Sequence, residues 1–537
     1  MPILNSLIDP AGPAFAANRD EMLSLLSHVR GLEDRVRSLS DQRRAQFADR
    51  GQLMPRDRVE FLLDRGSPFL ELASLAGLGM HEDDGKDFVM GGNIIAGIGY
   101  VSGRCCMVIC HNSALKGGTI LPIGLKKHVR AQQIAIENKL PTIYLVESGG
   151  GNLKYQSEIF VDGGRQFANQ ARMSAAGIPQ ISVVHGSSTA GGAYIPGLSD
   201  YVIMVRNRAK VFLAGPPLLK AATGEIATDE ELGGAEMHST TSGVSDFMVE
   251  DDREAIECAR NIVAGLDLAA FSAEAKPFKP PRFDPEELVG VVPADFRKGY
   301  DVHEVLARLV DDSDFSDFKP LYGPATVCGQ ARIEGHPVAF ICNNGPIDAE
   351  GSAKAGQFIQ LMCQAGTPIV YLQNITGYMV GTDAERSGIV KHGSKMIQAV
   401  ANATVPQITI HIGASFGAGN YGMCGRSFDP RFLFAWPNNR VAVMGGEQAA
   451  KVMDIVAEEG ARRRGVEPDR VSLKNSSDKL IAQFDRESTA LYITSRVWDD
   501  GIIDPRDTRR VLMFCLRICR EGDARKLNPS TFGVPRF

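Results

Sequence analysis

The chain has 537 residues, of which 44% are apolar and 23% charged, and its formal net charge is −6. This length predicts two domains of about 250 residues each, and the acidic balance excludes the basic surface of a nucleic-acid-binding protein. No apolar run approaches the roughly 20 residues that span a bilayer, so we expect no membrane segment. Asp9, Asp20 and Glu21 stand where a targeting segment would be apolar or Arg-rich, which favours the cytoplasm.

Residues 18–50 are predicted to form an N-terminal helical arm, because apolar residues recur there at helical spacing among Arg and Glu side chains. From Ile94 to Phe271 short apolar strands alternate with helices, for example in "CCMVICH", "IGLKKHVRAQQIAIENK" and "TIYLVESGG". This is the βαβ pattern of a parallel sheet. Prolines break the segment from Ala275 to Arg297, which we expect to be a linker.

After the linker the pattern returns in "VAFICNNG", "SAKAGQFIQLMCQAG" and "TPIVYLQNITG". The charged stretch from Ala457 to Asp485 is predicted to be a solvated, partly helical excursion and not a binding patch. The chain is therefore predicted to hold two α/β domains of one design, residues 1–280 with the helical arm and residues 281–537.

Ten cysteines in a chain of this size indicate free thiols in a reducing compartment. Cys105, Cys106 and Cys110 share one apolar strand-like run, and Cys515 and Cys519 fall on one helix face. Neither group has the paired CxxC spacing of a zinc site. We predict buried thiols and no protein-bound metal.

Two pairs of segments repeat at a single offset. In the first pair, Pro141 begins "PTIYLVESGGGN" and Pro368 begins "PIVYLQNITGYM". In the second pair, Pro179 in "GIPQISVVHGSSTAGGAY" corresponds to Pro406 in "TVPQITIHIGASFGAGNY". Both pairs are 227 residues apart (368 − 141 and 406 − 179). A repeat at one offset indicates an internal duplication.

In each copy a β-branched strand ends in a Gly-rich turn before a helix, at Gly186 to Tyr194 and at Gly413 to Gly422. Backbone N–H groups at such a turn point outward together and stabilise an oxygen that becomes negative. One such turn alone is more often close packing, but the paired turns favour a site that polarises two carbonyls. Neither turn is a P-loop, a dinucleotide fingerprint or a nucleophile elbow. His185 is predicted to be a packed or hydrogen-bonded strand residue, so a serine hydrolase is disfavoured.

These residues resemble the crotonase-like carboxyltransferase family, the β subunits of biotin-dependent acyl-CoA carboxylases. The matching segments run in the family's order from about residue 50 to 510. They include "LKGGTILPIGLKKHVRAQQIA", "GIPQISVVHGSSTAGGAYIPGLSDYVIMV", "FLAGPPLLKAATGE", "YLQNITGYMVG", "GASFGAGNYGMCGR" and "WPNNRVAVMGGEQAA". The resemblance implies two duplicated ββα-superhelix domains of the ClpP/crotonase superfamily, and it is nearest to the geranyl-CoA and 3-methylcrotonyl-CoA carboxylases.

The resemblance also implies a reaction. Carboxybiotin releases CO2 in the site, the biotin nitrogen takes a proton from the acyl-CoA, and the resulting enolate attacks the CO2. Carried over by position, the thioester oxyanion hole falls at the amides of Ala190 and Gly191, and the biotin oxyanion hole at those of Ala418 and Gly419. Because biotin accepts the proton, no side-chain base is required.

Further site residues are carried over from the same motifs. On the acyl-CoA side we expect Lys116, Gly117, Gly118, Gly151, Gly192, Ala193, Tyr194, Lys220 and Thr223, although Lys220 taken alone is somewhat better explained as a solvated helix residue. On the biotin side we expect Thr376, Gly377, Tyr378, Phe416, Gly417, Asn420 and Tyr421.

Gly163 and Gly164 bear on the choice of substrate. Methylcrotonyl-type members have a longer, Phe-containing stretch where this chain reads "EIFVDGGRQFANQA", about three residues shorter. Loss of aromatic bulk leaves room for the extra isoprene unit of geranyl-CoA, each CH2 of which contributes about 0.8 kcal/mol when buried. We therefore expect geranyl-CoA as substrate in terpene catabolism, with 3-methylcrotonyl-CoA of leucine catabolism as the alternative. The glycines would otherwise only make a turn.

Two other functions stay open: another crotonase-like acyl-CoA enzyme such as a hydratase or isomerase, which needs only one oxyanion turn, and a non-catalytic scaffold subunit. The chain lacks the "AMKM" lysine motif, so biotin must arrive on a partner, the biotin carboxylase and carrier α subunit. The resemblance further implies a hexamer of this chain within an α6β6 assembly, with each site between the first domain of one subunit and the second domain of another.

Overall fold

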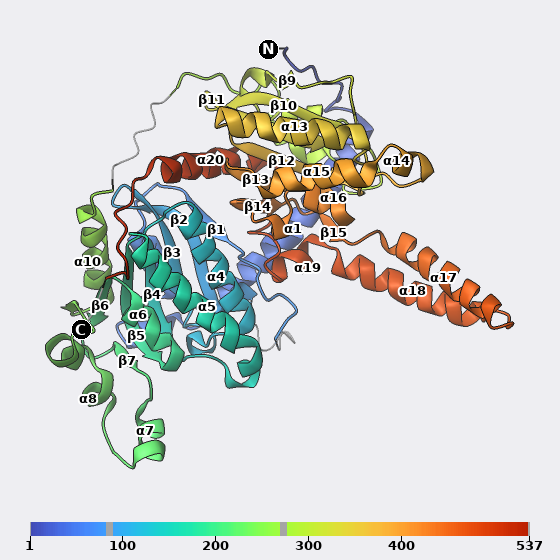
Figure 1. Ribbon diagram of the computed structural model, residues 1–537. Coiled ribbons are helices and arrows are strands. Elements are labelled where there is room, and N and C mark those ends of the chain that lie inside the picture. The colour runs from blue at the N-terminus through green and yellow to red at the C-terminus, as the bar shows by residue number, and fades with distance from the viewer. Residues whose placement is uncertain (1, 82–89, 269–275, 535–537) are drawn as a thin grey trace. The chain divides into compact units, whose positions relative to one another are not determined.

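The computed structural model describes residues 2–81, 90–268 and 276–534, and its backbone forms two compact units. The first-half unit comprises Gly31–Ala273, Ser495–Val497 and Arg517–Phe537. The second-half unit comprises Met1–Arg30, Glu274–Thr494 and Trp498–Leu516. Each unit contains its own sheet (Figure 1).

The sheet of the first-half unit has eight strands in the described residues, in the order β1-β2-β3-β4-β5-β6-β8 with β7 beside β5. Only β1, β2 and β3 pair antiparallel, and the later strands are parallel as the βαβ pattern predicts. The strands are β1 (Phe69–Leu72), β2 (Ile94–Val101), β3 (Arg104–His111), β4 (Thr142–Ser148), β5 (Gln180–Thr189), β6 (Tyr201–Val205), β7 (Lys210–Phe212) and β8 (Phe247–Val249).

The sheet of the second-half unit has seven strands in the part of the chain that the structure describes, in the order β14-β13-β12-β11-β10-β9 with β15 beside β13. Strands β9, β10 and β11 pair antiparallel, and the others are parallel. The strands are β9 (Ser316–Asp317), β10 (Thr326–Ile333), β11 (His336–Asn343), β12 (Ile369–Ile375), β13 (Gln407–Phe416), β14 (Phe432–Ala435) and β15 (Arg440–Ala442).

The central strands of both sheets are continuous apolar runs, as expected where helices cover both faces. Helices α4 and α5 pack side by side in the first-half unit, and α13 and α15 do so in the second (Figure 1). The helices are α1 (Pro13–Asp41), α2 (Arg44–Asp49), α3 (Pro55–Leu62), α4 (Pro122–Glu137), α5 (Gln156–Ala175), α6 (Tyr194–Leu198), α7 (Pro216–Thr223), α8 (Asp229–Gly233), α9 (Ala235–Met237), α10 (Asp252–Gly265), α11 (Leu288–Val291), α12 (His303–Leu306), α13 (Ala349–Ala365), α14 (Thr382–Arg386), α15 (Ile389–Ala401), α16 (Gly417–Gly422), α17 (Gly446–Arg463), α18 (Arg470–Glu487), α19 (Ala490–Ser495) and α20 (Thr508–Ala524).

The two sheets repeat the offset found in the sequence. Strand β12 begins and ends 227 residues after β4, and β13 does so after β5. Even a core hydrogen bond is duplicated, because Tyr144 Oη donates to Gln180 Oε1 at 3.1 Å and Tyr371 Oη donates to Gln407 Oε1 at 2.8 Å. The predicted duplication is therefore confirmed in the backbone and in the core.

Several predicted elements have different limits in the structure. The N-terminal arm is two helices and not one, because α1 ends at Asp41 and α2 begins at Arg44. The predicted linker contains the short helix α11, and Ala275, where the linker was expected to begin, lies outside the described residues. Residues 1–30 belong to the second-half unit, in which Ser6 Oγ donates to Glu304 at 2.5 Å.

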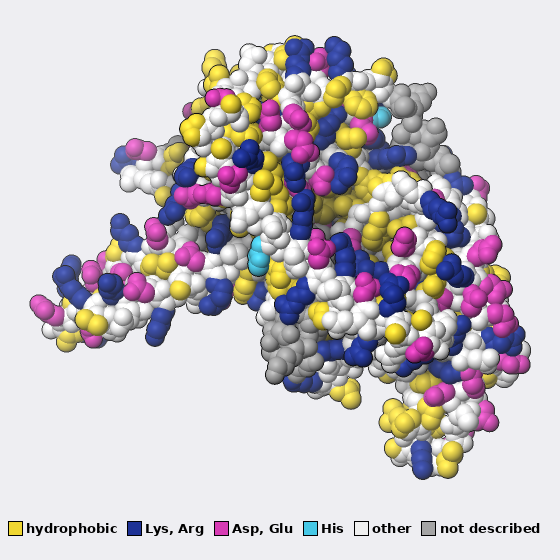
Figure 2. Space-filling view, turned by 180° about the vertical axis from the view of Figure 1, so that it is seen from behind, with side chains coloured by type: hydrophobic (Ala, Val, Ile, Leu, Met, Phe, Trp, Pro, Cys, Tyr) yellow, Lys and Arg dark blue, Asp and Glu magenta, His cyan; other side chains and the backbone are white. Residues whose placement is uncertain are grey.

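Helices α17 and α18 form a hairpin in the second-half unit (Figure 1). Helix α18 has no buried residue, so this part of the stretch from Ala457 to Asp485 is solvated as predicted, whereas Ala461 is buried and Phe484 lines a cavity. On the face seen in Figure 2, side chains of both charges alternate along the hairpin with apolar ones between them. Within the described ranges no helix combines the length and the apolar character needed to cross a bilayer.

Candidate active site

The turn of the first-half unit follows β5 directly. A 3-10 turn, η4, covers Ala190–Ala193, and α6 then begins at Tyr194. Ala190 has φ 52°, in the left-handed region, so the chain turns sharply at the carboxyl end of the strand. Ser188 Oγ donates to Gly192 O at 2.9 Å and closes the turn. The amides that follow Ala190 lie at the start of a helical segment, where N–H groups have no intrahelical acceptor.

Other predicted glycines lie beside this turn. Ser148, the last residue of β4, donates from Oγ to Gly118 O at 3.0 Å and accepts from Gly150 N–H at 3.1 Å. A Cβ placed on Gly150 would lie 3.2 Å from Thr189 O, so the two loops touch. The structure therefore brings the following predicted residues to one sheet edge: Lys116, Gly117, Gly118, Gly151, Ala190, Gly191, Gly192, Ala193 and Tyr194.

Gly163 and Gly164 lie inside helix α5, so the alternative that they only make a turn is wrong. A Cβ on either would meet nothing within 4 Å. The ring of Phe167 lies 5.5 Å from that of Tyr194 between centroids, and 3.8 Å from a Cβ placed on Gly191. Residues four apart share a helix face. Gly163 therefore leaves open space one helical turn before Phe167, the aromatic side chain that lies beside Gly191.

Lys220 and Thr223 lie exposed on α7. Thr223 Oγ1 donates to Leu219 O at 3.0 Å, within the same helix. Among the described residues no hydrogen bond or ion pair joins either side chain to the turn.

A buried charge cluster lies behind the first-half turn and consists of Arg58, Glu147, His185 and Asp252. The Arg58 guanidinium is fully buried and donates to Glu147 at 2.6 Å and to Asp252 at 3.2 Å. His185 Nδ1 lies 2.9 Å from Asp252 Oδ1, so its predicted hydrogen-bonded state is confirmed. Burial raises the pKa of Glu147, but the attraction and hydrogen bond of Arg58 outweigh it and leave that pKa below its ordinary value.

The turn of the second-half unit repeats the geometry. Strand β13 leads directly into α16 at Gly417, whose φ of 56° matches the 52° of Ala190. Asn420 Nδ2 donates to Ser415 Oγ at 2.7 Å and closes this turn as Ser188 closes the first. Both halves thus end a buried parallel strand in the same left-handed turn.

The offset of 227 also pairs Gly191 with Ala418 and Gly192 with Gly419. Gly191 and Ala418 are exposed, whereas Gly192 and Gly419 are buried. A Cβ placed on Gly419 would lie 3.0 Å from Gly377 Cα, so Gly419 packs against the loop after β12. The pair equivalent to Ala190 and Gly191 is therefore half-buried Gly417 and exposed Ala418, one residue before the predicted pair of Ala418 and Gly419.

The remaining predicted residues of this half surround the turn. Thr376, Gly377 and Tyr378 follow β12, and burial raises the pKa of Tyr378 to about 12. Phe416 is buried, with its ring 5.3 Å from that of Phe296 between centroids.

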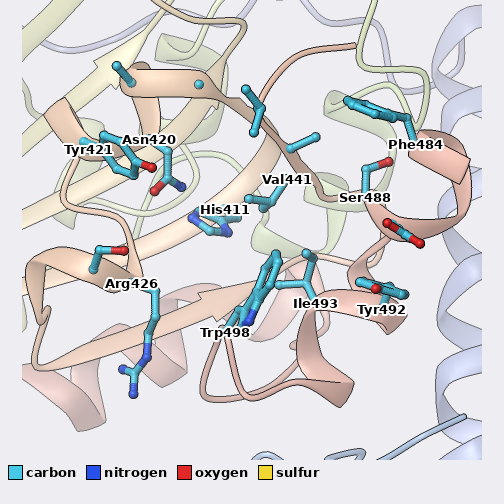
Figure 3. Close-up of a pocket in the computed structure, with 16 residues that line it drawn as sticks. His411, Asn420, Tyr421, Arg426, Val441, Phe484, Ser488, Tyr492, Ile493 and Trp498 are labelled. Atoms are coloured by element: carbon cyan, nitrogen blue, oxygen red, sulfur yellow. The ribbon is translucent and has the colours of Figure 1, made fainter. Parts of the chain in front are cut away.

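A cavity of about 680 Å³ opens beside the second-half turn (Figure 3), within the usual range for small-molecule sites. Four predicted residues line it: Gly417, Ala418, Asn420 and Tyr421. The sequence reasoning missed its other wall, which includes His411, Val441, Ile493 and Trp498.

His411 is the unexplained polar group of this cavity. Its side chain is 2% exposed, and neither ring nitrogen has a hydrogen-bond partner among the described residues. Burial lowers the pKa of His411 to about 3, so the imidazole is neutral at physiological pH. A buried polar group without a partner indicates a missing ligand or water. The only sequence signal was a histidine inside the apolar run "QITIHIG".

Asp499 follows the cavity residue Trp498 and is fully buried. Burial raises the pKa of Asp499 to about 7. Between about pH 4 and pH 7 the folded state keeps a proton that the unfolded state has lost, so stability falls as the pH rises through this window. Asp499→Asn is expected to raise the melting temperature more at pH 8 than at pH 5, measured by thermal denaturation. An equal rise in melting temperature at both pH values would contradict the raised pKa of Asp499.

Comparisons with known proteins cover nearly the whole chain. The model of the carboxyl transferase domain matches residues 46–533. The probable methylcrotonoyl-CoA carboxylase beta chain, mitochondrial, of Drosophila melanogaster is 47% identical over 556 residues, which cover 100% of this chain and 95% of the relative. The biotin-dependent 3-methylcrotonyl-coenzyme A carboxylase beta1 subunit of Mycobacterium tuberculosis (strain ATCC 25618 / H37Rv) is 49% identical, with 93% of this chain and 94% of the relative covered.

Among solved structures, the beta subunit of P. aeruginosa geranyl-CoA carboxylase matches with a TM-score of 0.94 and 55% identity, covering 100% of both chains. The similarity therefore includes both halves and both turns.

Proposed function

Because the chain belongs to the carboxyl transferase domain family, we propose that it is the β subunit of a biotin-dependent carboxylase whose substrate is geranyl-CoA. Its activity is carboxyl transfer from carboxybiotin to the γ-carbon, the β-methyl group, of a branched α,β-unsaturated acyl-CoA. The expected fold of two crotonase-like α/β domains is confirmed by the duplicated sheets and by the structural similarity. The choice of geranyl-CoA over 3-methylcrotonyl-CoA is the part that is proposed.

The observation that carries the proposal is the pair of equivalent turns. We assign the thioester oxygen to the amides of Ala190 and Gly191, because both residues are exposed at the start of η4. Removal of a proton from the β-methyl group sends charge through the conjugated double bond to that oxygen, and N–H groups at the turn stabilise it. In the second half the amides of Gly417 and Ala418 have the equivalent position, and buried Gly419 packs behind them against the loop after β12.

The cavity residues fit biotin. Val441, Ile493 and Trp498 offer an apolar wall for a compact ring system, while neutral His411 supplies an unused hydrogen-bonding group. When bound, biotin supplies the carboxyl group and the nitrogen that accepts the substrate proton. The chain's own residues then have to bind and orient the two ligands and polarise their carbonyl groups, which agrees with a site built from backbone amides.

Gly163 supports geranyl-CoA within this scheme. Glycine in a helix interior costs roughly 0.5–1 kcal/mol relative to alanine, yet α5 carries two in succession with open space beside them. The open space lies near the Phe167 and Tyr194 rings that border the thioester turn. An acyl chain longer by one isoprene unit has room there.

Gly163→Phe restores aromatic bulk at this point and is expected to lower the kcat/KM ratio of geranyl-CoA to 3-methylcrotonyl-CoA about tenfold or more. The matched control Gly163→Ala adds a single methyl group, so it should stabilise α5 and leave the ratio unchanged. Steady-state kinetics with both substrates provides the measurement. If Gly163→Phe lowers both kcat/KM values equally, the glycine does not select the chain length.

We also propose a homo-oligomer, an α6β6 assembly with the biotin carboxylase and carrier α subunit, and a cytoplasmic location. Large apolar side chains are exposed in both halves: Leu153 corresponds to Val380 at the offset of 227, and Phe160, Val161 and Val390 are exposed within the same stretches of sequence. Exposed apolar clusters mark interaction surfaces. A monomer in light scattering would contradict the oligomer, and an organellar fraction would contradict the location.

A further inference from the structure

Each half has a β-bulge immediately before its turn. In the first half Val146 pairs with Val184 but Ser148 pairs with Ser188, so residues 185–187 of β5 lie opposite the single residue Glu147 of β4, and β5 has two extra residues there. The second half has the same irregularity between Gln373 and Ile375, opposite β13. Bulges re-aim the strand that follows them. These bulges therefore set where the two turns point.

One polar side chain fills each bulge. In the first half a Cβ placed on Gly186 would lie 2.7 Å from Glu147 Oε1. In the second half the position equivalent to Glu147 is Asn374, whose Oδ1 accepts from Ala414 N–H at 3.1 Å and occupies the space beside Gly413. Glu147 and Asn374 are called the bulge residues below.

The two bulge residues are held by different chemistry. Glu147 is anchored by Arg58 at 2.6 Å, by Ser113 Oγ at 2.7 Å and by Gln52 Nε2 at 3.2 Å. Asn374 is uncharged, and the second half has Ile412 where the first has His185. The ionic anchor is therefore a property of the first half alone.

We propose that Glu147 is a positioning residue for the first-half turn: its anchored carboxylate holds the bulge at Gly186, and the bulge aims the amides of Ala190 and Gly191 at the thioester oxygen. The inference rests on the proposed function, which assigns the acyl-CoA to this half. Asn374 is the equivalent positioning residue for the second-half turn. Changes at Glu147 should therefore affect the acyl-CoA, and changes at Asn374 should affect biotin.

The test is the polarisation of the bound thioester. Acyl-CoA labelled with 13C at the thioester carbonyl is added to the full chain without its partner, and the 13C shift is recorded by NMR. Wild type is expected to move the signal downfield, because amides that donate to the oxygen polarise the carbonyl. Glu147→Gln is expected to reduce that shift and to lower kcat about tenfold to 100-fold with the partner present. The matched control Asn374→Ser should leave the 13C shift unchanged.

Gly186→Ala provides a second variant if Glu147→Gln does not fold. It forces the bulge away from the carboxylate without removing a charge, and it should reduce the 13C shift in the same way. An unchanged 13C shift and kcat in a folded variant would overturn the positioning role. If wild type itself binds no acyl-CoA, the proposed function fails instead, and the two failures are distinguishable.

Discussion

Gly191→Pro is expected to lower kcat about 100- to 1000-fold, because it removes one of the two amide donors assigned to the thioester oxygen. Proline is tolerated in the first turn of a helical segment, and Gly191 is the second residue of η4 and has no positive φ. The measurement is the steady-state rate of acyl-CoA carboxylation with the biotinylated partner. Thermal denaturation confirms that the variant is folded.

Gly191→Ala is the matched control. It keeps the N–H, and its Cβ would lie 3.8 Å from Phe167, an ordinary contact. We expect a kcat within about tenfold of wild type. If Gly191→Pro and Gly191→Ala lose the same amount of activity, the loss is steric and the amide is not a donor to the reaction.

Arg58→Met is expected to lower the free energy of unfolding by about 3–5 kcal/mol, because it leaves the carboxylates of Glu147 and Asp252 buried without their cation. The shift of the urea denaturation midpoint provides the measurement. Arg37→Met is the matched control. Arg37 pairs with Asp34 at 3.3 Å and both side chains are exposed, so its loss should cost about 1 kcal/mol or less. Equal midpoints for the two variants would contradict a buried cluster.

The parts of the fold that depend on local pattern could be predicted from the sequence. The strands at Thr142–Ser148 and Ile369–Ile375 are β-branched runs bounded by proline and glycine, and both formed where the pattern places them. Gly163 and Gly164 show the limit of local rules. A Gly-Gly pair usually marks a turn, but here the helix continues through it, and only the structure shows the open space beside the pair.

The candidate site could be predicted only in part, and for a related reason. The two turns carry a local signal, whereas the groups behind them come together through long-range packing. Arg58 lies 89 residues from Glu147, and no spacing rule connects them. His411 likewise became a candidate only when β13 was seen to place it in the cavity wall with Trp498.

The most direct measurement compares kcat/KM for geranyl-CoA and 3-methylcrotonyl-CoA, using the wild-type chain with its biotinylated partner, ATP and bicarbonate. We predict turnover of both substrates, with geranyl-CoA equal to or better than 3-methylcrotonyl-CoA, because the open space beside Gly163 accommodates the longer chain. Turnover of 3-methylcrotonyl-CoA alone would contradict the choice of geranyl-CoA and leave the carboxyltransferase assignment in place.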